Sequence, residues 1–341
     1  MNNELTTLSQ QMIPAMEQEM GLIFNTHINP PNPFYGMMQY HMGWVDQEFQ
    51  PAKVHGGKRI RPLICMLAAQ AAGGDWKQST PAAAAIEILH NFSLIHDDIE
   101  DASPTRRGRL TVWKIWGEAQ AINCGDAMFS VAHLSMCRLS KQDVPSATVV
   151  RALCRFDETC LLLTQGQYND MDFETRDGVQ VNEYIAMITG KTAVLLSLCS
   201  ELGAIVAGQD EETIANYAAF GLNLGLAFQV IDDILGIWGD ENRTGKSAAT
   251  DIITKKKTLP VLYGLERSAE LRELYLTATA DEQFVDQVVT LLDETGARQY
   301  ASAIATDYST AALKHLEATN PAGDAGTALR QLAAMLLQRD F

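Results

Sequence analysis

Two short acidic segments contain the residues of this sequence that are best suited to do chemistry. Residues 93–101 have the sequence SLIHDDIED and residues 228–236 have FQVIDDILG, and each segment lies at or near the end of a long apolar stretch. On a helix, Asp97 and Asp101 are one turn apart and share a face, so their carboxylates can converge on a hard cation; Asp232 can do the same from a second helix. Magnesium prefers a few carboxylates together with phosphate oxygens and water. The two segments therefore predict a magnesium site that is open to a phosphate ligand.

A diphosphate bound there would need cations for the oxygens that the metal ions leave free, and basic residues lie close by. Arg106 and Arg107 follow the first acidic segment across a short loop. Lys58 and Arg61 belong to GGKRIRP at 56–62, whose glycines allow the backbone to approach a ligand closely. A single basic cluster is more often a solvated face, so its combination with the acidic segments is what favours phosphate binding.

Two polar residues fall on the same helical faces as the carboxylates. Gln229 lies about one turn before Asp232, and His90 lies two turns before Asp97. Each can therefore face the same cavity as its carboxylate. A lone histidine in an apolar helix is more often a satisfied core residue, and that interpretation stays open for His90.

The elements that must position these residues are helices, and the sequence predicts an all-α fold. From Arg59 onward apolar residues recur at helical spacing, and strand-like alternation is scarce. A clear helix is expected from Thr80, an N-cap followed by Pro81, to about Asp101. Other helices are expected at 60–72, 147–172, 181–208, 211–238, 257–268, 280–295, 297–318 and 327–337. We expect a single domain over 1–341, in which residues 1–55 form an N-terminal segment without a readable signature.

Composition excludes several classes of protein. The 341 residues are 47% hydrophobic and 20% charged, which is ordinary for a globular protein with a sizeable core. The formal net charge of −16 argues against a nucleic acid partner. No apolar run approaches the ~20 residues of a membrane span, and the first residues lack the pattern of a signal peptide, so we expect no transmembrane segment and a cytoplasmic location. The six cysteines lack metal-ligand spacing and are interpreted as buried thiols.

Seven segments, taken in order, resemble the trans-isoprenyl diphosphate synthase family over about residues 56–263. They are GGKRIRP at 56–62, DDIED at 97–101, RRG at 106–108, GKT at 190–192, FQVIDD at 228–233, TGK at 244–246 and KTLP at 257–260. The resemblance implies an isoprenoid-synthase fold, which is a bundle of roughly ten or more helices around a central substrate cavity. It also implies a homodimer.

The same resemblance implies a prenyltransferase that joins isopentenyl diphosphate head to tail to an allylic diphosphate. About three magnesium ions would be held by Asp97, Asp98, Asp101, Asp232 and Asp233. The allylic diphosphate would be bound by Arg106, Lys191, Thr192, Gln229, Lys246 and Lys257, and isopentenyl diphosphate by Lys58, Arg61, His90 and Arg107. Ionisation would give an allylic cation, which the isopentenyl double bond attacks before a proton is lost. The residues implied in catalysis are Asp97, Asp101, Asp232, Lys191, Thr192 and Gln229, of which the last two would stabilise positive charge by their dipoles.

Product length is expected to depend on residues that precede the first acidic motif. The resemblance implies that the growing chain runs between helices toward a floor formed here by Phe92 and Ser93, with Leu89 about a turn deeper. An aromatic ring at Phe92 limits the depth, whereas Ser93 opens it. We expect geranylgeranyl diphosphate as the product, with farnesyl diphosphate next; the alternative that Phe92 is only a core residue stays open.

The sequence departs from the family at Gly236, where the second acidic motif usually ends in a third Asp. Asp232 can still serve, and Asp240 lies one turn beyond. Two other functions stay open. A class I terpene synthase ionises a similar substrate but holds no second one, which the basic residues that we assign to isopentenyl diphosphate argue against. A catalytically silent subunit of a heteromeric synthase usually lacks the first acidic motif, which is complete here.

Overall fold

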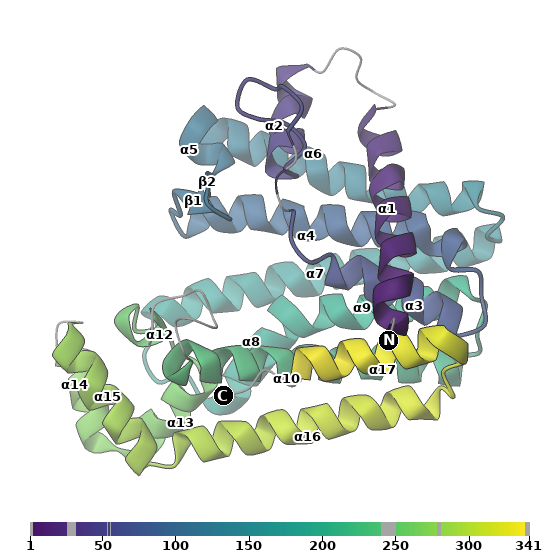
Figure 1. Ribbon diagram of the computed structural model, residues 1–341. Helices are drawn as coiled ribbons and strands as arrows, with labels where there is room; N and C mark the ends of the chain where they lie inside the picture. Colours follow the sequence, from purple (N-terminus) through teal and green to yellow (C-terminus); the bar gives the residue numbers. More distant parts are fainter. Residues whose placement is uncertain are drawn as a thin grey trace. The chain divides into compact units, whose positions relative to one another are not determined.

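The structure is a computed structural model that describes residues 3–25, 32–52, 54, 56–239, 250–277 and 281–337. Over this part of the chain almost every element is a helix (Figure 1). The exception is a two-stranded antiparallel hairpin made of β1 (Thr105–Arg106) and β2 (Arg109–Leu110). The prediction of an all-α fold is confirmed.

The chain groups into two compact units. The first comprises Met1–Arg155, Cys199–Asp210 and Pro321–Leu329, and the second comprises Phe156–Leu198, Glu211–Asn320 and Arg330–Phe341. Three helices continue from one unit into the other, namely α7 (Ser146–Thr175), α9 (Val194–Val206) and α17 (Gly323–Leu337). A single domain over 1–341 stays a prediction.

The first unit is built around α4 (Thr80–Glu100), which carries the first acidic motif on its last turn. It packs mainly against α6 (Glu118–Cys137), with α3 (Ile60–Ala71) and α1 (Glu4–Asn25) also against it. The run Ala82–Ala85 at its start is fully buried, and such small side chains allow neighbouring helices to approach closely. The remaining named helices of this unit are α2 (Pro33–His41), the 3-10 turns η1 (Trp76–Ser79) and η2 (Arg138–Lys141), and α5 (Val112–Trp116).

The N-terminal segment, which the sequence analysis left without structure, contributes two of these helices. Met12, Met16 and Met20 recur every fourth residue along α1 and are fully buried, together with Phe24. This spacing places them on one face, which packs against α3 and α4. Helices α1 and α2 therefore take part in the core of the first unit.

The second unit is built around α10 (Glu211–Trp238), which carries the second acidic motif. It packs mainly against α16 (Ala297–Ala318) and against a π-helical turn, η3 (Thr189–Ala193), that follows α8 (Val181–Ile188). The other described helices here are α12 (Thr250–Ile253), α13 (Leu259–Arg267), α14 (Ala269–Thr277) and α15 (Glu282–Glu294). The helix predicted at 181–208 is thus interrupted by the π-turn that contains GKT.

Two helical stretches, Val181–Val206 and Glu211–Trp238, are long and apolar enough to cross a bilayer, but 61% of each apolar window is buried inside the protein. This burial fits core helices, and the cytoplasmic location stays a prediction. The cysteines are all free. Cys65, Cys124, Cys160 and Cys199 are buried, whereas Cys137 and Cys154 are exposed, so the interpretation as buried thiols was wrong for these two.

Candidate active site

The first acidic motif occupies the C-terminal turn of α4, where its three aspartates differ in exposure. Asp97 is half-buried, Asp98 is buried and Asp101, the C-cap residue, is exposed. The Asp101 amide donates to the Asp97 carbonyl at 2.9 Å, which confirms that the two residues are one helical turn apart. Asp97 and Asp101 therefore present a pair of carboxylates at the helix end.

Asp98 turns toward the β1–β2 hairpin instead. Its Oδ1 accepts a hydrogen bond from Arg106 Nε at 2.7 Å, while its buried Oδ2 has no hydrogen-bond partner among the described residues. Burial raises the pKa of Asp98, and the Arg106 guanidinium opposes this rise. The ion pair uses only Nε of Arg106, which leaves the two terminal nitrogens for a phosphate.

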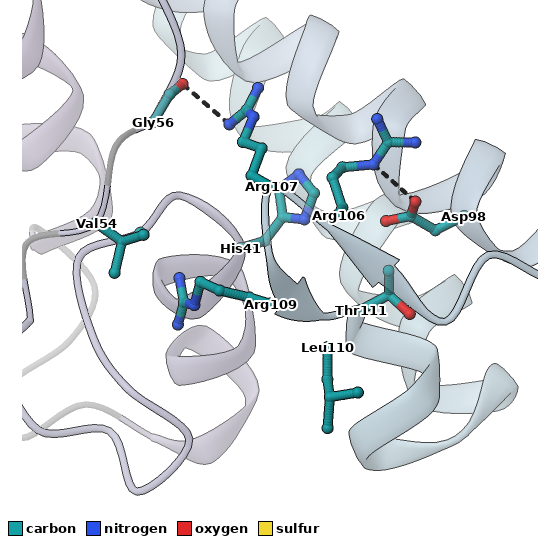
Figure 2. Close-up of a pocket in the computed structure, with 10 residues that line it drawn as sticks. His41, Val54, Gly56, Asp98, Arg106, Arg107, Arg109, Leu110 and Thr111 are labelled. Carbon is teal, nitrogen blue, oxygen red and sulfur yellow. Dashed lines mark hydrogen bonds and ion pairs between the residues drawn. The ribbon is translucent and has the colours of Figure 1, made fainter. Parts of the chain in front are cut away.

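The hairpin and the N-terminal segment enclose a strongly basic pocket (Figure 2). Arg107 lies at the turn with φ of 52° and donates from Nη1 to the Gly56 carbonyl at 2.9 Å. A Cβ at Gly57, whose φ is 97°, would lie 3.3 Å from Arg107 Nη2, so the glycine lets the guanidinium lie against the backbone. Arg109 donates to the carbonyls of Tyr40 and Val45, both at 2.9 Å, and thus fixes the N-terminal segment.

His41, at the end of α2, is a pocket residue that the sequence analysis missed. Its Nε2 is buried and has no hydrogen-bond partner in the part of the chain that the structure describes. Burial and then the neighbouring Arg107, Arg106 and Arg109 lower the pKa of His41 to about 3, against a small opposing effect of Asn91. The imidazole is therefore neutral at physiological pH. No motif marked it in the sequence.

Arg61 and His90, both predicted to bind isopentenyl diphosphate, are neighbours in the structure. Arg61 Nη1 lies 3.2 Å from His90 Nε2. Burial, followed by Arg61 and Arg107, lowers the pKa of His90 well below its usual value, so Nε2 of the neutral ring accepts from the guanidinium. Arg61 Nε is buried, and no described residue accepts a hydrogen bond from it. Lys58 is exposed.

Arg59 shows why only part of the GGKRIRP segment can bind a ligand. Arg59 points inward and forms a buried ion pair with Glu87 of α4, and its Nε also lies 3.6 Å from Glu17 of α1. Glu87 in turn accepts from Asn91 Nδ2 at 2.9 Å. This buried pair anchors the start of α3 on α4.

In the second unit, three predicted residues form a continuous chain of hydrogen bonds. Thr192 Oγ1 in the π-turn donates to Gln229 Oε1 at 3.0 Å, and Gln229 Nε2 donates to Asp233 Oδ1 at 3.1 Å. Lys191 in the same turn forms an ion pair with Asp170 of α7. A Cβ on Gly190 would lie 2.9 Å from the Leu162 carbonyl, so this glycine lets the π-turn pack directly on α7.

The two aspartates of the second motif also differ. Asp232 is half-buried, whereas Asp233 is buried and accepts from Tyr184 Oη at 2.5 Å and from the Leu259 amide at 3.2 Å in addition to Gln229. Burial raises the pKa of Asp233 to about 7, against the opposing effect of these donors. Asp233 thus holds α8, α10 and the start of α13 together.

The adjacent lysines after α12 make different contacts, which the sequence did not indicate. Lys257, predicted to bind the allylic substrate, donates from Nζ to the carbonyls of Phe173 at 2.6 Å and Arg176 at 2.7 Å, and so caps the end of α7. Lys256 lies among the acidic residues instead. Burial lowers its pKa, but Asp170, Asp251, Asp233 and Asp232 outweigh this effect and raise it. Lys246 lies outside the described residues.

Residues 43–292 match the family model described as Polyprenyl synthetase. This chain belongs to the polyprenyl synthetase family. Its membership makes it a prenyltransferase. The first unit contains the first acidic motif and the basic pocket, and the second unit contains the second acidic motif and the π-turn.

Polyprenyl synthetases of known name are similar to this chain over most of its length. It is 43% identical over 252 residues to a geranylgeranyl diphosphate synthase of Mycobacterium tuberculosis, which covers 73% of this chain and 71% of the relative. It is 37% identical over 311 residues to a (2E,6E)-farnesyl diphosphate synthase of Mycobacterium bovis, covering 89% and 84%.

Solved polyprenyl synthetase structures share the fold. The structure of a polyprenyl synthetase from Streptomyces coelicolor A3(2) superposes with a TM-score of 0.85 at 34% identity and covers 98% of both chains. A polyprenyl synthase from Caulobacter crescentus, complexed with calcium and isoprenyl diphosphate, gives a TM-score of 0.80 at 29% identity and covers 99% of both chains.

The residues that we expect to set product length in this prenyltransferase lie on α4 within the first unit. The half-buried Phe92 ring lies 4.8 Å from that of His96 and 5.1 Å from that of Phe129 on α6. Ser93 Oγ donates to the His90 carbonyl at 2.9 Å, and Leu89 is buried. Phe92 therefore belongs to an aromatic layer between α4 and α6, and its role in product length stays a prediction.

Proposed function

We propose that this prenyltransferase joins isopentenyl diphosphate head to tail to an allylic diphosphate, with magnesium as its cofactor and geranylgeranyl diphosphate as its product, farnesyl diphosphate being the alternative. The observation that carries the proposal is the basic pocket beside the first acidic motif. Arg106 and Arg107 line it, and the Arg61–His90 pair lies in the same unit. An enzyme that only ionises one allylic diphosphate needs no such second set of cations.

The acidic residues fit magnesium by the chemistry of their donors. Asp97, Asp101 and Asp232 offer hard carboxylate oxygens, and they are more accessible than Asp98 and Asp233, whose carboxylates already accept hydrogen bonds from neighbouring side chains. The orphaned Oδ2 of Asp98 is a further acceptor for a hydrated ion. Bound magnesium would neutralise charge on the departing diphosphate. About three ions is the number that the family resemblance implies.

The protein's own residues supply the remaining interactions with the allylic diphosphate. The terminal nitrogens of Arg106 and the ammonium of Lys191, which Asp170 orients, bind its oxygens. When the carbon–oxygen bond ionises, the oxygen dipoles of Thr192 and Gln229 stabilise the allylic cation; their mutual hydrogen bond fixes both side chains beforehand.

Isopentenyl diphosphate needs only positioning. Arg61, Arg107 and Lys58 hold its phosphates, and the neutral His90 orients the Arg61 guanidinium. The isopentenyl double bond attacks the cation, and a proton is then lost to the departing diphosphate.

A direct assay tests this function. Purified protein is incubated with isopentenyl diphosphate and dimethylallyl, geranyl or farnesyl diphosphate, with magnesium or a chelator, and the products are identified after removal of phosphate. Longer linear prenyl alcohols formed only with magnesium are expected from the wild type and from Asp143→Asn, which changes an exposed aspartate outside the site, but not from Asp101→Asn. Cyclic hydrocarbons from one allylic diphosphate would show a terpene synthase, and no turnover would show a subunit that needs a partner.

We propose a homodimer as well. Leu161 and Tyr168 lie seven residues apart on α7 and are 72% and 69% exposed, which is unusual for large apolar side chains. Together with Met171 they form an apolar stripe that a second copy would cover. Sedimentation equilibrium is expected to give twice the chain mass of 37.4 kDa; a monomer at micromolar concentration contradicts this proposal.

A further inference from the structure

The hydrogen-bond chain of the second unit runs from the buried interior to accessible residues of the site. At its inner end, Tyr184 on α8 donates from Oη to Asp233 on α10 at 2.5 Å. These two side chains are buried, whereas Gln229 and Thr192 at the other end are half-buried. Because Tyr184 is buried, it can influence a bound substrate only through the residues that follow it in the chain.

Each hydrogen bond of this chain has a fixed direction. A carboxylate can only accept, and the Leu259 amide, which donates to Asp233 Oδ2 at 3.2 Å, can only donate. Gln229 therefore turns its NH2 group toward Asp233 Oδ1 and its carbonyl oxygen toward Thr192. The Thr192 hydroxyl uses its only hydrogen in that bond. The atoms that Gln229 and Thr192 bring together are thus two oxygens with further lone pairs.

The opposite orientation of the Gln229 amide would reverse these dipoles. An amide fills nearly the same space when its oxygen and NH2 group are exchanged, so shape alone does not select one orientation. In the reversed orientation Gln229 would donate to Thr192 and turn positive hydrogens toward the place where an allylic cation needs negative charge. The acceptor on Asp233 therefore decides whether this part of the site can stabilise a cation.

Close packing brings the accessible end of the chain together. Gly225 lies one helical turn before Gln229 on α10, and a Cβ there would lie 2.6 Å from Cα of Ala193 in the π-turn. No side chain fits at this position, so the backbones of α10 and the π-turn are in direct contact. Thr192, which precedes Ala193, is thereby held within hydrogen-bond distance of Gln229.

Tyr184 fixes the carboxylate at the buried end. Its hydroxyl and the Leu259 amide both donate to Oδ2 of Asp233, which leaves Oδ1 for Gln229. The last torsion of an aspartate side chain is soft, so the position of Oδ1 depends on the donors that hold Oδ2. Loss of the phenol hydroxyl would loosen Oδ1 and, with it, the Gln229 amide.

We propose that Tyr184 is a positioning residue that acts through Asp233 on the Gln229 amide, so that the amide oxygen faces the allylic cation. This inference rests on the proposed function, and it deepens it by adding a buried residue that touches no substrate. The chain joins α8, α10 and the π-turn, so the orientation of the amide depends on the fold of the second unit rather than on a sequence motif.

The test compares binding of a charged and an uncharged analogue of geranyl diphosphate by isothermal titration calorimetry with magnesium. In the ammonium analogue a protonated nitrogen replaces carbon 3, whereas geranyl S-thiolodiphosphate resists ionisation and has no positive charge in its chain. Tyr184→Phe is expected to weaken binding of the ammonium analogue by on the order of fivefold, and to change binding of the thiolodiphosphate by less than about twofold. Tyr217→Phe, which removes another buried hydroxyl from the second unit, is expected to bind both analogues like the wild type.

A double-variant cycle shows whether Tyr184 acts through Gln229. Gln229→Leu removes the amide and is expected to weaken binding of the ammonium analogue, and Tyr184→Phe is expected to add no further loss in that background. Unchanged binding of the ammonium analogue in Tyr184→Phe, equal losses for the two analogues, or a further loss in the Gln229→Leu background overturns the inference. A wild type that gives no product with any allylic diphosphate refutes the proposed function instead. Because analogue binding is measured without turnover, the two failures are distinct.

Discussion

The neutral His41 makes the stability of the first unit depend on pH in a way that can be calculated. Burial and three arginines lower the pKa of His41 from its usual 6.5 to about 3. The unfolded chain therefore binds a proton below about pH 6.5, whereas the folded protein does not until about pH 3. The contribution of His41 to stability is complete above pH 6.5 and is lost as the pH falls.

The size of this loss follows from the difference in pKa. At about pH 5 the unfolded imidazole is about 1.5 units below its pKa, and each unit corresponds to about 1.36 kcal/mol, so the free energy of unfolding falls by about 2 kcal/mol relative to about pH 8. His90, whose pKa is also lowered, adds to the total loss in the same direction. A comparison with a variant at position 41 isolates the part that belongs to His41.

We expect His41→Gln, which keeps a neutral side chain of similar length, to lose about 2 kcal/mol less than the wild type between about pH 8 and pH 5. Urea unfolding at several pH values measures this difference, and any constant cost of the substitution cancels. The His41 imidazole NMR signal of the wild type can be assigned because it is absent from the spectrum of His41→Gln. We expect its chemical shift not to change between about pH 8 and pH 5. A signal that titrates near pH 6.5, or equal losses in the two proteins, refutes the reasoning.

Two further predictions concern residues of the site. Asp233→Asn is expected to lower the free energy of unfolding by about 1–3 kcal/mol, because buried donors lose their acceptor. Asp232→Asn is expected to change the free energy of unfolding by less than about 0.5 kcal/mol and to reduce kcat by on the order of 100-fold. Urea unfolding and steady-state kinetics measure these effects, and equal losses of stability in the two variants contradict the assignment. Phe92→Ala removes a ring from the layer with His96 and Phe129 and is expected to lengthen the product. Chromatography of the prenyl alcohols measures the product length, and an unchanged product distribution would show that Phe92 does not limit it.

The long helices were predictable because their signals are local. The helix expected at 80–101 is Thr80–Glu100, with Pro81 in its first turn, and those expected at 211–238 and 297–318 have these bounds in the structure. Apolar periodicity over many turns and a proline at the start leave few alternatives. The all-α architecture follows from the same pattern.

Helix α6 was missed because the local helix propensity of its sequence is low, although its packing in the fold favours a helix. Gly125 in its middle lowers helix propensity, but a Cβ there would lie 2.2 Å from His96 Nε2 on α4. The glycine is needed for the contact between the two helices, which local propensity does not record. Pro14 inside α1 has a similar effect on the N-terminal segment, where burial of the methionine face outweighs it.

The acidic motifs and their order could be predicted from sequence, but the tasks of adjacent basic residues could not. Lys255, Lys256 and Lys257 are equivalent in the sequence, yet Lys255 donates to the Tyr275 carbonyl, Lys256 lies among carboxylates and Lys257 caps α7. These differences depend on contacts with residues about 20 to 80 positions away along the chain. His41 is a similar case, since only the folded pocket brings it to the arginines.

In both Asp-Asp pairs the two carboxylates differ in their burial and contacts, and helix geometry explains why. Consecutive residues of a helix point about 100° apart, so the two carboxylates of a pair cannot face one ligand equally. In both motifs the second aspartate is the buried one: Asp98 holds Arg106, and Asp233 holds Gln229. Each of these partners is a residue that we propose contacts the allylic substrate. In each pair, therefore, we propose that the first aspartate binds the metal and the second orients a substrate-binding side chain. A substitution of the second aspartate should then affect substrate binding through Arg106 or Gln229.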